Sequence, residues 1–370
     1  MHKKYKIYYF HPYSQVGGAD LSISRIINGL DDKIFDVVFI SLSNPLIKKY
    51  IKKKIKFVKI KSKKTLFSIF KIQKFLKNDF NKKYYKHIFV SNQNFANVIS
   101  FFILYKLKWI KHILIERNHI DEFKFNKNIV HMFKNKIISL LMKVLFKHAD
   151  VIIGISKKLS NDLEKFINSK VKNIYNPSYD KDIYKLSKFK IKKKYSFKKF
   201  ILSIGRLEDQ KDHMTLLKAY KEISDKINYK LIIIGYGTEL NKIKNFIKNN
   251  NLKNRVIILT NIKNAFPYYK FAKIFILSSK YEGFGNVLVE AAMFKIPIIS
   301  SNCNSGPLEI LNHNKGGEIF PVGNVKILKK KILKVLKKRD NNKVKYMSKR
   351  IKLFEKRNII KQYTEVFQKI

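Results

Sequence analysis

Residues Ser278–Phe294 read Ser-Ser-Lys-Tyr-Glu-Gly-Phe-Gly-Asn-Val-Leu-Val-Glu-Ala-Ala-Met-Phe, and this stretch decides the fold. Just before it, Ile274–Leu277 is a short apolar run without alternation, which predicts a buried parallel strand. A strand, a glycine-rich turn and a helix in this order direct backbone N–H groups and the positive helix end at an anion. The carboxylates of Glu282 and Glu290 cannot bind that anion, so they are free to accept hydrogen bonds from hydroxyl groups. A sugar that carries a phosphate offers both an anion for the helix end and hydroxyl groups for the carboxylates.

Apolar runs alternate with helical patterns along the whole chain, which predicts an α/β protein whose parallel sheets are covered by helices. A length of 370 residues suggests two domains, and we expect both to be doubly wound and Rossmann-like, with a cleft at the carboxyl ends of their strands. The predicted strands are Lys6–Phe10, Val37–Ser41, Ile88–Ser91, Ile110–Glu116, Val151–Ile155, Phe200–Gly205, Leu231–Gly235, Val256–Leu259, Ile274–Leu277 and Pro297–Ser300.

The spacing of Glu282 and Glu290 resembles the E-x7-E motif of retaining glycosyltransferases with the two-domain GT-B fold, in particular glycosyltransferase family 4. The run Pro297–Leu311, which contains Cys-Asn-Ser-Gly-Pro-Leu-Glu-Ile-Leu, is similar to a run in members that build bacterial surface polysaccharides. The resemblance covers most of the chain and is strongest from about residue 200 to 312. It implies an enzyme of the EC 2.4 class that moves a hexosyl or N-acetylhexosaminyl group from a nucleotide sugar, more often UDP than GDP, to a glycan hydroxyl.

The resemblance assigns a role to each glutamate. It implies that Glu290 holds the ribose hydroxyls, and that Glu282 is catalytic, contacting the transferred sugar and supporting the oxocarbenium charge. The other donor-binding residues implied in this turn are Gly283, Phe284, Gly285, Asn286 and Val287. The alternative is a first helical turn enriched in acidic residues because of the helix dipole.

Two cations follow another predicted strand. Arg206 stands at the strand end, and Lys211 comes just before a helix that begins near Asp212. They resemble the family pair G-R-x-x-x-x-K, which grips the donor diphosphate. Fixed cations offset the charge that grows on a departing nucleoside diphosphate. Two cations on a solvated loop are the alternative.

The first half of the chain supplies two weaker signals. Gly17 and Gly18, followed by Ala19-Asp20, open a helix predicted at Leu21–Leu30 and resemble the family's Gly-Gly-Ala-Glu loop near the diphosphate, with aspartate in place of glutamate. His119 follows the strand Ile110–Glu116 and matches the place of the family's catalytic histidine, although Ile120 stands where an acidic residue is usual. A simple glycine turn and a packing histidine are the alternatives.

The predicted domain boundaries combine composition with the resemblance. We expect an acceptor-binding domain at 1–176, a polar linker at 177–199, a nucleotide-sugar-binding domain at 200–342, and helices at 343–370 that pack back on the first domain. Phe354 and Tyr363 are the expected packing anchors of those helices.

No metal and no cofactor are expected. Asp180 and Asp182 have the D-x-D spacing of metal–diphosphate sites in a different glycosyltransferase fold, but they lie in the linker and not at a strand end. There is no His/Cys cluster with zinc-ligand spacing, and the single Cys303 excludes a disulfide framework.

The chain carries 79 Lys and Arg against 26 Asp and Glu, a net charge of +53. Compositional bias, an anionic membrane surface and nucleic acid are the three explanations. Lys48–Lys64 is rich in lysines interleaved with apolar residues, and Thr65–Lys77 has one broad apolar face at helical spacing beside lysines, as a helix lying on a membrane requires. Phe123–Lys147 is a second candidate, and an ordinary helix packed on the first-domain sheet fits both segments too. There is no apolar run of 18 residues, so we expect a cytoplasmic protein that is peripheral on the membrane's cytoplasmic face and uses a lipid-linked acceptor.

Three other functions remain open. A basic nucleic-acid-binding protein would explain the charge, but the aromatic residues mostly lie inside apolar runs. A catalytically silent subunit that binds a nucleotide sugar is disfavoured because Glu282, Arg206 and Lys211 are all present. A GT-B epimerase or phosphorylase is the third, although the chain has no pyridoxal-phosphate lysine motif.

Overall fold

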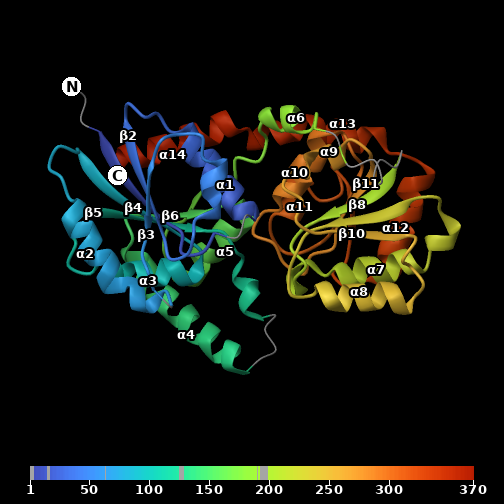
Figure 1. Ribbon diagram of the computed structural model, residues 1–370, viewed down its shortest axis with the longest axis horizontal. Coiled ribbons are helices and arrows are strands. Elements are labelled where there is room, and N and C mark those ends of the chain that lie inside the picture. Colours follow the sequence, from blue (N-terminus) through green and yellow to red (C-terminus); the bar gives the residue numbers. More distant parts are fainter. Residues whose placement is uncertain (1–3, 15–16, 63, 125–128, 190, 192–198) are drawn as a thin grey trace. The chain divides into compact units, whose positions relative to one another are not determined.

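The computed structural model describes residues 4–14, 17–62, 64–124, 129–189, 191 and 199–370. The chain divides into two compact units, each built on one sheet (Figure 1). Unit 1 contains Met1–Pro177 together with Lys356–Ile370, and unit 2 contains Ser178–Glu355. The last helix therefore belongs to the unit with which the chain begins.

The sheet of unit 1 is parallel, with strand order β3-β2-β1-β4-β5-β6-β7. Its strands are β1 (Tyr5–Phe10), β2 (Phe35–Ser41), β3 (Lys56–Lys59), β4 (Lys86–Asn92), β5 (Ile110–Glu116), β6 (Val151–Gly154) and β7 (Lys172–Asn173). The order reverses beside β1, which pairs with β2 on one side and β4 on the other. This is the topology of a doubly wound sheet, in which the ligand-binding edge lies at the carboxyl ends of the strands.

Helices cover both faces of this sheet. They are α1 (Gly18–Gly29), α2 (Ile69–Asp79), α3 (Asn94–Leu104), α4 (Ile129–Leu145), α5 (Lys157–Ile167) and α14 (Lys356–Lys369), with short 3₁₀ turns η1 (Leu46–Tyr50), η2 (Leu66–Ser68), η3 (Ile120–Lys124) and η4 (Phe146–His148). Ile72 of α2 and Ile103 of α3 are buried against Tyr8 and Phe10 of β1. α1 contacts α14, and the ring of Phe367 lies edge-on to a ring of β2.

The sheet of unit 2 repeats the same order, β10-β9-β8-β11-β12-β13, and it is also parallel. Its strands are β8 (Phe200–Ile204), β9 (Lys230–Ile234), β10 (Val256–Leu259), β11 (Ala272–Leu277), β12 (Ile298–Ser301) and β13 (Glu318–Phe320). β8 and β11 are neighbours although more than 60 residues separate them in the sequence. Their carboxyl ends are therefore brought to one edge.

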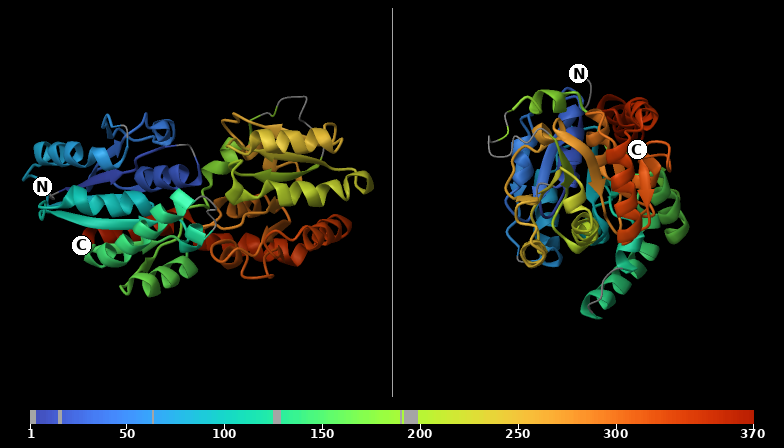
Figure 2. Two further views of the ribbon diagram at one scale, coloured as in Figure 1. Left: turned by 90° about the horizontal axis from the view of Figure 1, so that it is seen from below. Right: turned by 90° about the vertical axis from the view of Figure 1, so that its right-hand side faces the viewer.

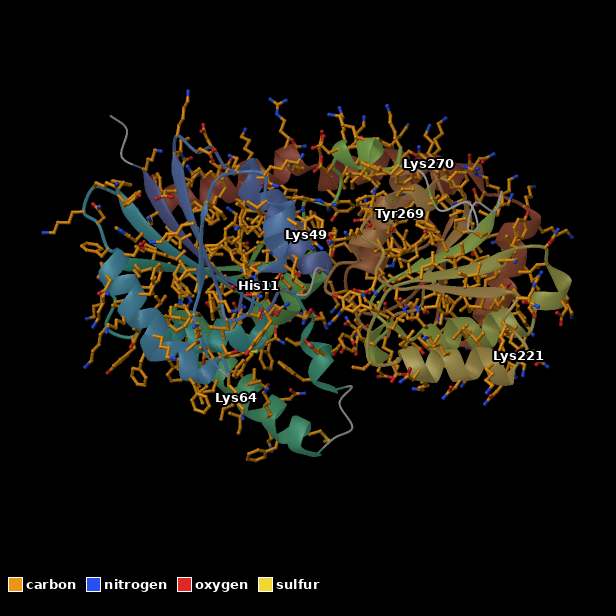
Figure 3. The ribbon with its side chains drawn as sticks, in the orientation of Figure 1. His11, Lys49, Lys64, Lys221, Tyr269 and Lys270 are labelled. Atoms are coloured by element: carbon orange, nitrogen blue, oxygen red, sulfur yellow. The ribbon has the colours of Figure 1, made fainter. Side chains whose placement is uncertain are left out.

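The helices of unit 2 are α6 (Asp182–Leu186), α7 (His213–Lys221), α8 (Leu240–Asn249), α9 (Phe266–Tyr269), α10 (Asn286–Met293), α11 (Pro307–Ile310), α12 (Val325–Lys337) and α13 (Asn341–Arg350), with 3₁₀ turns η6 (Asp209–Lys211), η7 (Ser224–Lys226) and η8 (Ile351–Phe354). Leu216 of α7 and Leu328 of α12 are fully buried with Ile276 of β11 in one apolar core. Lysines such as Lys221 and Lys270 lie at the surface of this unit (Figure 3).

The expected strands are all present, with ends shifted by at most two residues, and the prediction of two doubly wound α/β units is confirmed. The stretch 177–199 differs from a plain linker, because it contains α6 and all but its first residue belongs to unit 2. The tail also differs. Of 343–370, only Lys356–Ile370 belongs to unit 1, and Phe354 lies edge-on to Phe284 inside unit 2 with ring centroids 5.2 Å apart.

Among the helices in the described part of the chain, none is long and apolar enough to cross a membrane.

Candidate active site

The first wall of the site in unit 2 is the loop between β8 and α7. Gln210 holds this loop to the one that follows β11, because its side chain donates a hydrogen bond to the Tyr281 carbonyl at 3.0 Å and its own carbonyl accepts one from the Lys280 N–H at 2.8 Å. The Arg206 guanidinium donates to the Gln210 side-chain oxygen at 3.0 Å. Arg206 is exposed, so its remaining N–H groups face solvent at the carboxyl edge of the sheet. This is the geometry required to receive an anion.

The second wall carries Glu282, a carboxylate that is 6% exposed. Its Oε1 atom forms an ion pair with the Lys211 ammonium and accepts a hydrogen bond from the Ser279 hydroxyl at 2.7 Å. Lys211 is held in turn, since its carbonyl accepts a bond from Ser278 at 3.0 Å. A buried carboxylate costs little only when it is paired and hydrogen-bonded, and both conditions are met here.

A third loop, after β12, supports the Glu282 loop from behind. The Ser305 hydroxyl donates to the Glu282 carbonyl, and the Ser301 hydroxyl donates to the Ser279 carbonyl at 2.6 Å. Gly306 has φ +32°, and a Cβ added there would lie 1.9 Å from the Phe284 carbonyl oxygen. Only glycine allows this approach, so the Ser-Gly-Pro run fixes the backbone that presents Glu282.

α10 begins directly after the loop that carries Glu282. Its N-cap, Gly285, has φ +100° and ψ +54°, a left-handed conformation that favours glycine. Glu290 lies one turn into the helix, is 6% exposed, and accepts a hydrogen bond at 3.0 Å from the hydroxyl of Tyr269, which comes from α9 (Figure 3). The ring of Tyr269 is stacked on Phe294 with centroids 5.5 Å apart. Glu290 is therefore held by packing as well as by its hydrogen bond.

His213 lies beneath the Arg206 loop and is buried without a charge partner. Its Nε2 atom lies 3.3 Å from the Arg206 carbonyl and donates to it, and Nδ1 has no hydrogen-bond partner. Burial, and then the nearby Lys211 charge, lower the pKa of His213 to about 4. The ring is therefore neutral at physiological pH.

This lowered pKa predicts an acid-dependent loss of stability. The unfolded chain binds the His213 proton more tightly than the folded protein does, so the contribution is fully present above pH 6.5 and is lost as the pH falls toward 4. The difference corresponds to about 3 kcal/mol of unfolding free energy. Urea unfolding at pH 7 and pH 4 should show that His213→Asn loses less stability than the wild type. The exposed-histidine control His148→Asn should follow the wild-type curve, and equal losses in all three proteins would contradict the prediction.

In unit 1, the predicted glycines lie at the start of α1. Gly17 is the N-cap, and its N–H donates to a carboxylate oxygen of Asp20 at 3.1 Å. Asp20 also accepts from the Ser14 hydroxyl at 2.6 Å and lies 3.5 Å from His11. Partners of this kind keep the pKa of Asp20 below its ordinary value although burial raises it. Asp20, which stands where the family has the longer glutamate, thus still reaches back to the Gly17 N–H. A Cβ added at Gly17 would meet nothing within 4 Å.

His119 follows β5 and is buried between two carboxylates. Its Nε2 atom lies 2.8 Å from Asp162 of α5, and its Nδ1 atom lies 3.1 Å from Asp121. The acidic neighbour that the sequence lacks at Ile120 is therefore supplied by two other residues. Arg117 is also buried and donates to Asn92 at 2.9 Å. Asp121 and Asp162 hold the His119 ring in one orientation at the carboxyl edge of the first sheet.

Comparisons with known proteins show the family and the fold of this chain. The family model of glycosyl transferases group 1 matches residues 185–354. The uncharacterized glycosyltransferase MJ1059 of Methanocaldococcus jannaschii is 34% identical over 301 residues, which cover 76% of this chain and 72% of that protein. This chain belongs to the group 1 glycosyltransferases.

A second relative of this glycosyltransferase is the N-acetylgalactosamine-N,N'-diacetylbacillosaminyl-diphospho-undecaprenol 4-alpha-N-acetylgalactosaminyltransferase of Campylobacter jejuni, 29% identical over 195 residues, or 52% of each chain. Among solved structures, a glycosyltransferase from Rickettsia africae has a TM-score of 0.76 at 20% identity, over 100% of this chain and 99% of that one. Anabaena HepE in complex with UDP and glucose has a TM-score of 0.79 at 17% identity, over 99% and 100%. The fold of both units is therefore that of GT-B glycosyltransferases.

The structure gathers the predicted residues of unit 2 at one edge of its sheet, on the loops after β8 and β11 and on the first turns of α10. Those of unit 1, Gly17, Gly18 and His119, lie at the carboxyl ends of β1 and β5. The roles assigned to all of them remain predictions. Four residues that the motifs did not reveal form hydrogen bonds to the predicted residues or to their loops: Gln210, Tyr269, Ser279 and Asp162.

Two further features complete the site's chemistry. In the part of the glycosyltransferase that the structure describes, no group of three or more His, Cys, Asp or Glu could hold a metal ion. Cys303 is buried, and burial raises the pKa of its thiol to about 12, so the thiol stays protonated at neutral pH.

Proposed function

We propose that this chain is a retaining glycosyltransferase of family 4 that moves a sugar from a nucleotide donor to a hydroxyl of a lipid-linked or cell-surface glycan. The observation that carries the proposal is the buried Glu282 carboxylate, fixed against Lys211 where β8 and β11 end. Such a carboxylate lies beside an anion-receiving turn and can stabilise positive charge on a sugar ring. The HepE structure, which contains UDP and glucose, supports a UDP-sugar donor.

In the proposed reaction, the bond between the anomeric carbon and the diphosphate oxygen breaks while the bond to the acceptor oxygen forms on the same face. The acceptor proton passes to the leaving phosphate. Glu282 stabilises the oxocarbenium charge, and Glu290 accepts hydrogen bonds from the ribose hydroxyls. Arg206 and Lys211 balance the charge that grows on the nucleoside diphosphate. For unit 1, we propose the roles that the resemblance implies: His119 acts on the donor sugar, and Gly17 and Gly18 act on the diphosphate.

We also propose that the reaction requires neither a metal ion nor another cofactor. A divalent cation in a nucleotide-sugar site neutralises the diphosphate, and Arg206 and Lys211 supply two positive charges for the same task. The Arg206 guanidinium is held by the Gln210 side chain, and the Lys211 carbonyl accepts from Ser278, so both cations have contacts that orient them before the donor arrives.

The proposed acceptor is carried by a lipid at the cytoplasmic face of a membrane, where the enzyme is peripheral. The named acceptor of the Campylobacter relative, a diphospho-undecaprenol saccharide, supports this choice. The net charge of +53 supports it too, because an anionic leaflet attracts basic proteins. Capsule, lipopolysaccharide or a related surface polysaccharide is the proposed product.

The experiment that tests the function is a donor panel. Slow hydrolysis of UDP-, GDP- and ADP-sugars is measured in the presence of EDTA for the wild type and Glu282→Ala. We expect one donor to be turned over selectively by the wild type, with EDTA having no effect, and its turnover to be lost in the variant. Binding of nucleic acid in place of every donor, unaffected by Glu282→Ala, would refute the proposal.

A further inference from the structure

Helix α4 of unit 1 carries two apolar stripes, and only one is covered. Ile138 and Met142 are buried, and α4 contacts α3 and α5. Phe133, Ile137, Leu140 and Val144 recur at helical spacing on another face and are exposed, Phe133 to 67% and Leu140 to 63%. A helix that only covers a sheet requires one such stripe. The second stripe has no partner within the described part of unit 1.

Further exposed apolar residues lie on or beside the neighbouring helices. α3 contacts both α2 and α4, and all three lie along the lower side of the first sheet in Figure 1. Phe70 of α2 is 81% exposed and Tyr105, after α3, is 67% exposed. We call this the α2–α4 surface; its exposed apolar residues are Leu66, Phe67, Phe70, Phe102, Tyr105, Met132, Phe133, Ile137, Leu140 and Val144. Apolar residues gathered in this way mark an interaction site.

The charged side chains of the three helices are almost all positive. Exposed lysines lie on or next to each of the three helices: Lys64, Lys71, Lys74, Lys77, Lys106, Lys108, Lys134, Lys136, Lys143 and Lys147. The only acidic residue of α2, α3 and α4 is Asp79, and it is paired with Lys56 at 2.6 Å and Lys6 at 3.4 Å. An apolar face bordered by lysines, without an unpaired carboxylate, is complementary to lipid tails beneath anionic headgroups.

We propose that the α2–α4 surface is the face by which this enzyme docks on an anionic lipid bilayer. The inference rests on the membrane partner proposed above and names the residues that contact it. A second copy of this chain fits less well, because it would bring the same lysines and a charge of +53 against them. Nucleic acid fits less well because Ile137, Leu140 and Val144 are aliphatic and offer no stacking surface. Figures 1 and 2 show α4 projecting beyond the rest of unit 1.

The test is co-sedimentation with vesicles of phosphatidylcholine alone and of phosphatidylcholine with phosphatidylglycerol. The wild type should bind only the mixed vesicles, and less at high salt. Phe70→Ser, Phe133→Ser and Leu140→Ser together should weaken binding by about a hundredfold or more, because each removes a large apolar side chain from the bilayer. The matched control carries Phe271→Ser and Leu353→Ser, which replace exposed apolar residues of unit 2, and it should bind as the wild type does.

Two readouts separate the docking surface from the proposed reaction. Hydrolysis of the soluble donor, measured on the same samples, should be unchanged in the triple variant, which also shows that it is folded. Equal vesicle binding by the triple variant and the wild type would overturn the docking surface and leave the reaction standing. So would a dimer that the triple variant dissociates, or nucleic-acid binding in place of vesicle binding. Vesicle binding without any donor turnover would refute the proposed reaction and leave the docking surface standing.

Discussion

Glu282→Gln is expected to lower kcat for sugar transfer by about 10²–10³-fold, with a much smaller effect on the KM for the donor. Glutamine keeps the shape of the side chain but removes the charge that would face the developing oxocarbenium ion. The amide oxygen can still accept from Ser279, so the loop should keep its position. The measurement is a steady-state assay with the donor identified by the panel, and circular dichroism shows that the variant is folded.

The ion pair supplies the controls for this prediction. Lys211→Met removes the other charge of the pair and should also lower kcat. Because the two groups act as a unit, the double variant should lose less activity than the two single losses combined. Glu222→Gln removes a carboxylate from an exposed ion pair with Lys329, 2.5 Å long and remote from the Glu282 loop in the sequence. It should leave kcat unchanged. An active Glu282→Gln enzyme would mean that the carboxylate only positions Lys211.

Gly306→Ala should reduce kcat/KM by about a hundredfold without touching any charged group. The new Cβ would lie 1.9 Å from the Phe284 oxygen and 2.4 Å from its carbonyl carbon, which are backbone atoms and cannot rotate away. The loop that carries Glu282 must therefore shift. We also expect a loss of about 1–3 kcal/mol in unfolding free energy, as for other overpacked sites. Donor turnover and urea unfolding measure the two effects.

Gly323→Ala is the matched control, because Gly323 also has a positive φ, +74°, but a Cβ there would meet nothing within 4 Å. It isolates the backbone strain of placing alanine in this region. If Gly323→Ala and Gly306→Ala were equally active, the close approach to Phe284 would not be what positions the Glu282 loop.

The central strands could be predicted because each contains an apolar run that is buried on both faces of the sheet. The strands that were missed are those for which this condition fails. β3 is an edge strand with exposed Lys56 and Lys59, and β7 has two residues. β13 begins with Glu318, which is buried only because three lysines surround it, Lys331 at 2.6 Å among them. A pattern of apolarity does not reveal a carboxylate that distant cations neutralise.

The residues of the candidate site also fall into those that the sequence could reveal and those that it could not. Glu282, Gly285 and Glu290 could be found from the sequence because they lie within nine residues of one another, on one turn and one helix. The ion pair with Lys211 joins residues 71 positions apart, and Asp162 lies 43 positions from His119. Such pairs depend on which strands become neighbours, and strand order is a property of the whole sheet.

In sequence order, most of unit 1 comes first, all of unit 2 follows, and α14 of unit 1 comes after it. During synthesis, unit 2 is therefore complete before the unit that precedes it. Until the final helix leaves the ribosome, α1 lacks its neighbour, and the apolar groups that will meet Tyr363 and Phe367 have no cover. Unit 1 of this enzyme is therefore incomplete until α14 has been made, so loss of α14 would destabilise the unit whose synthesis began first.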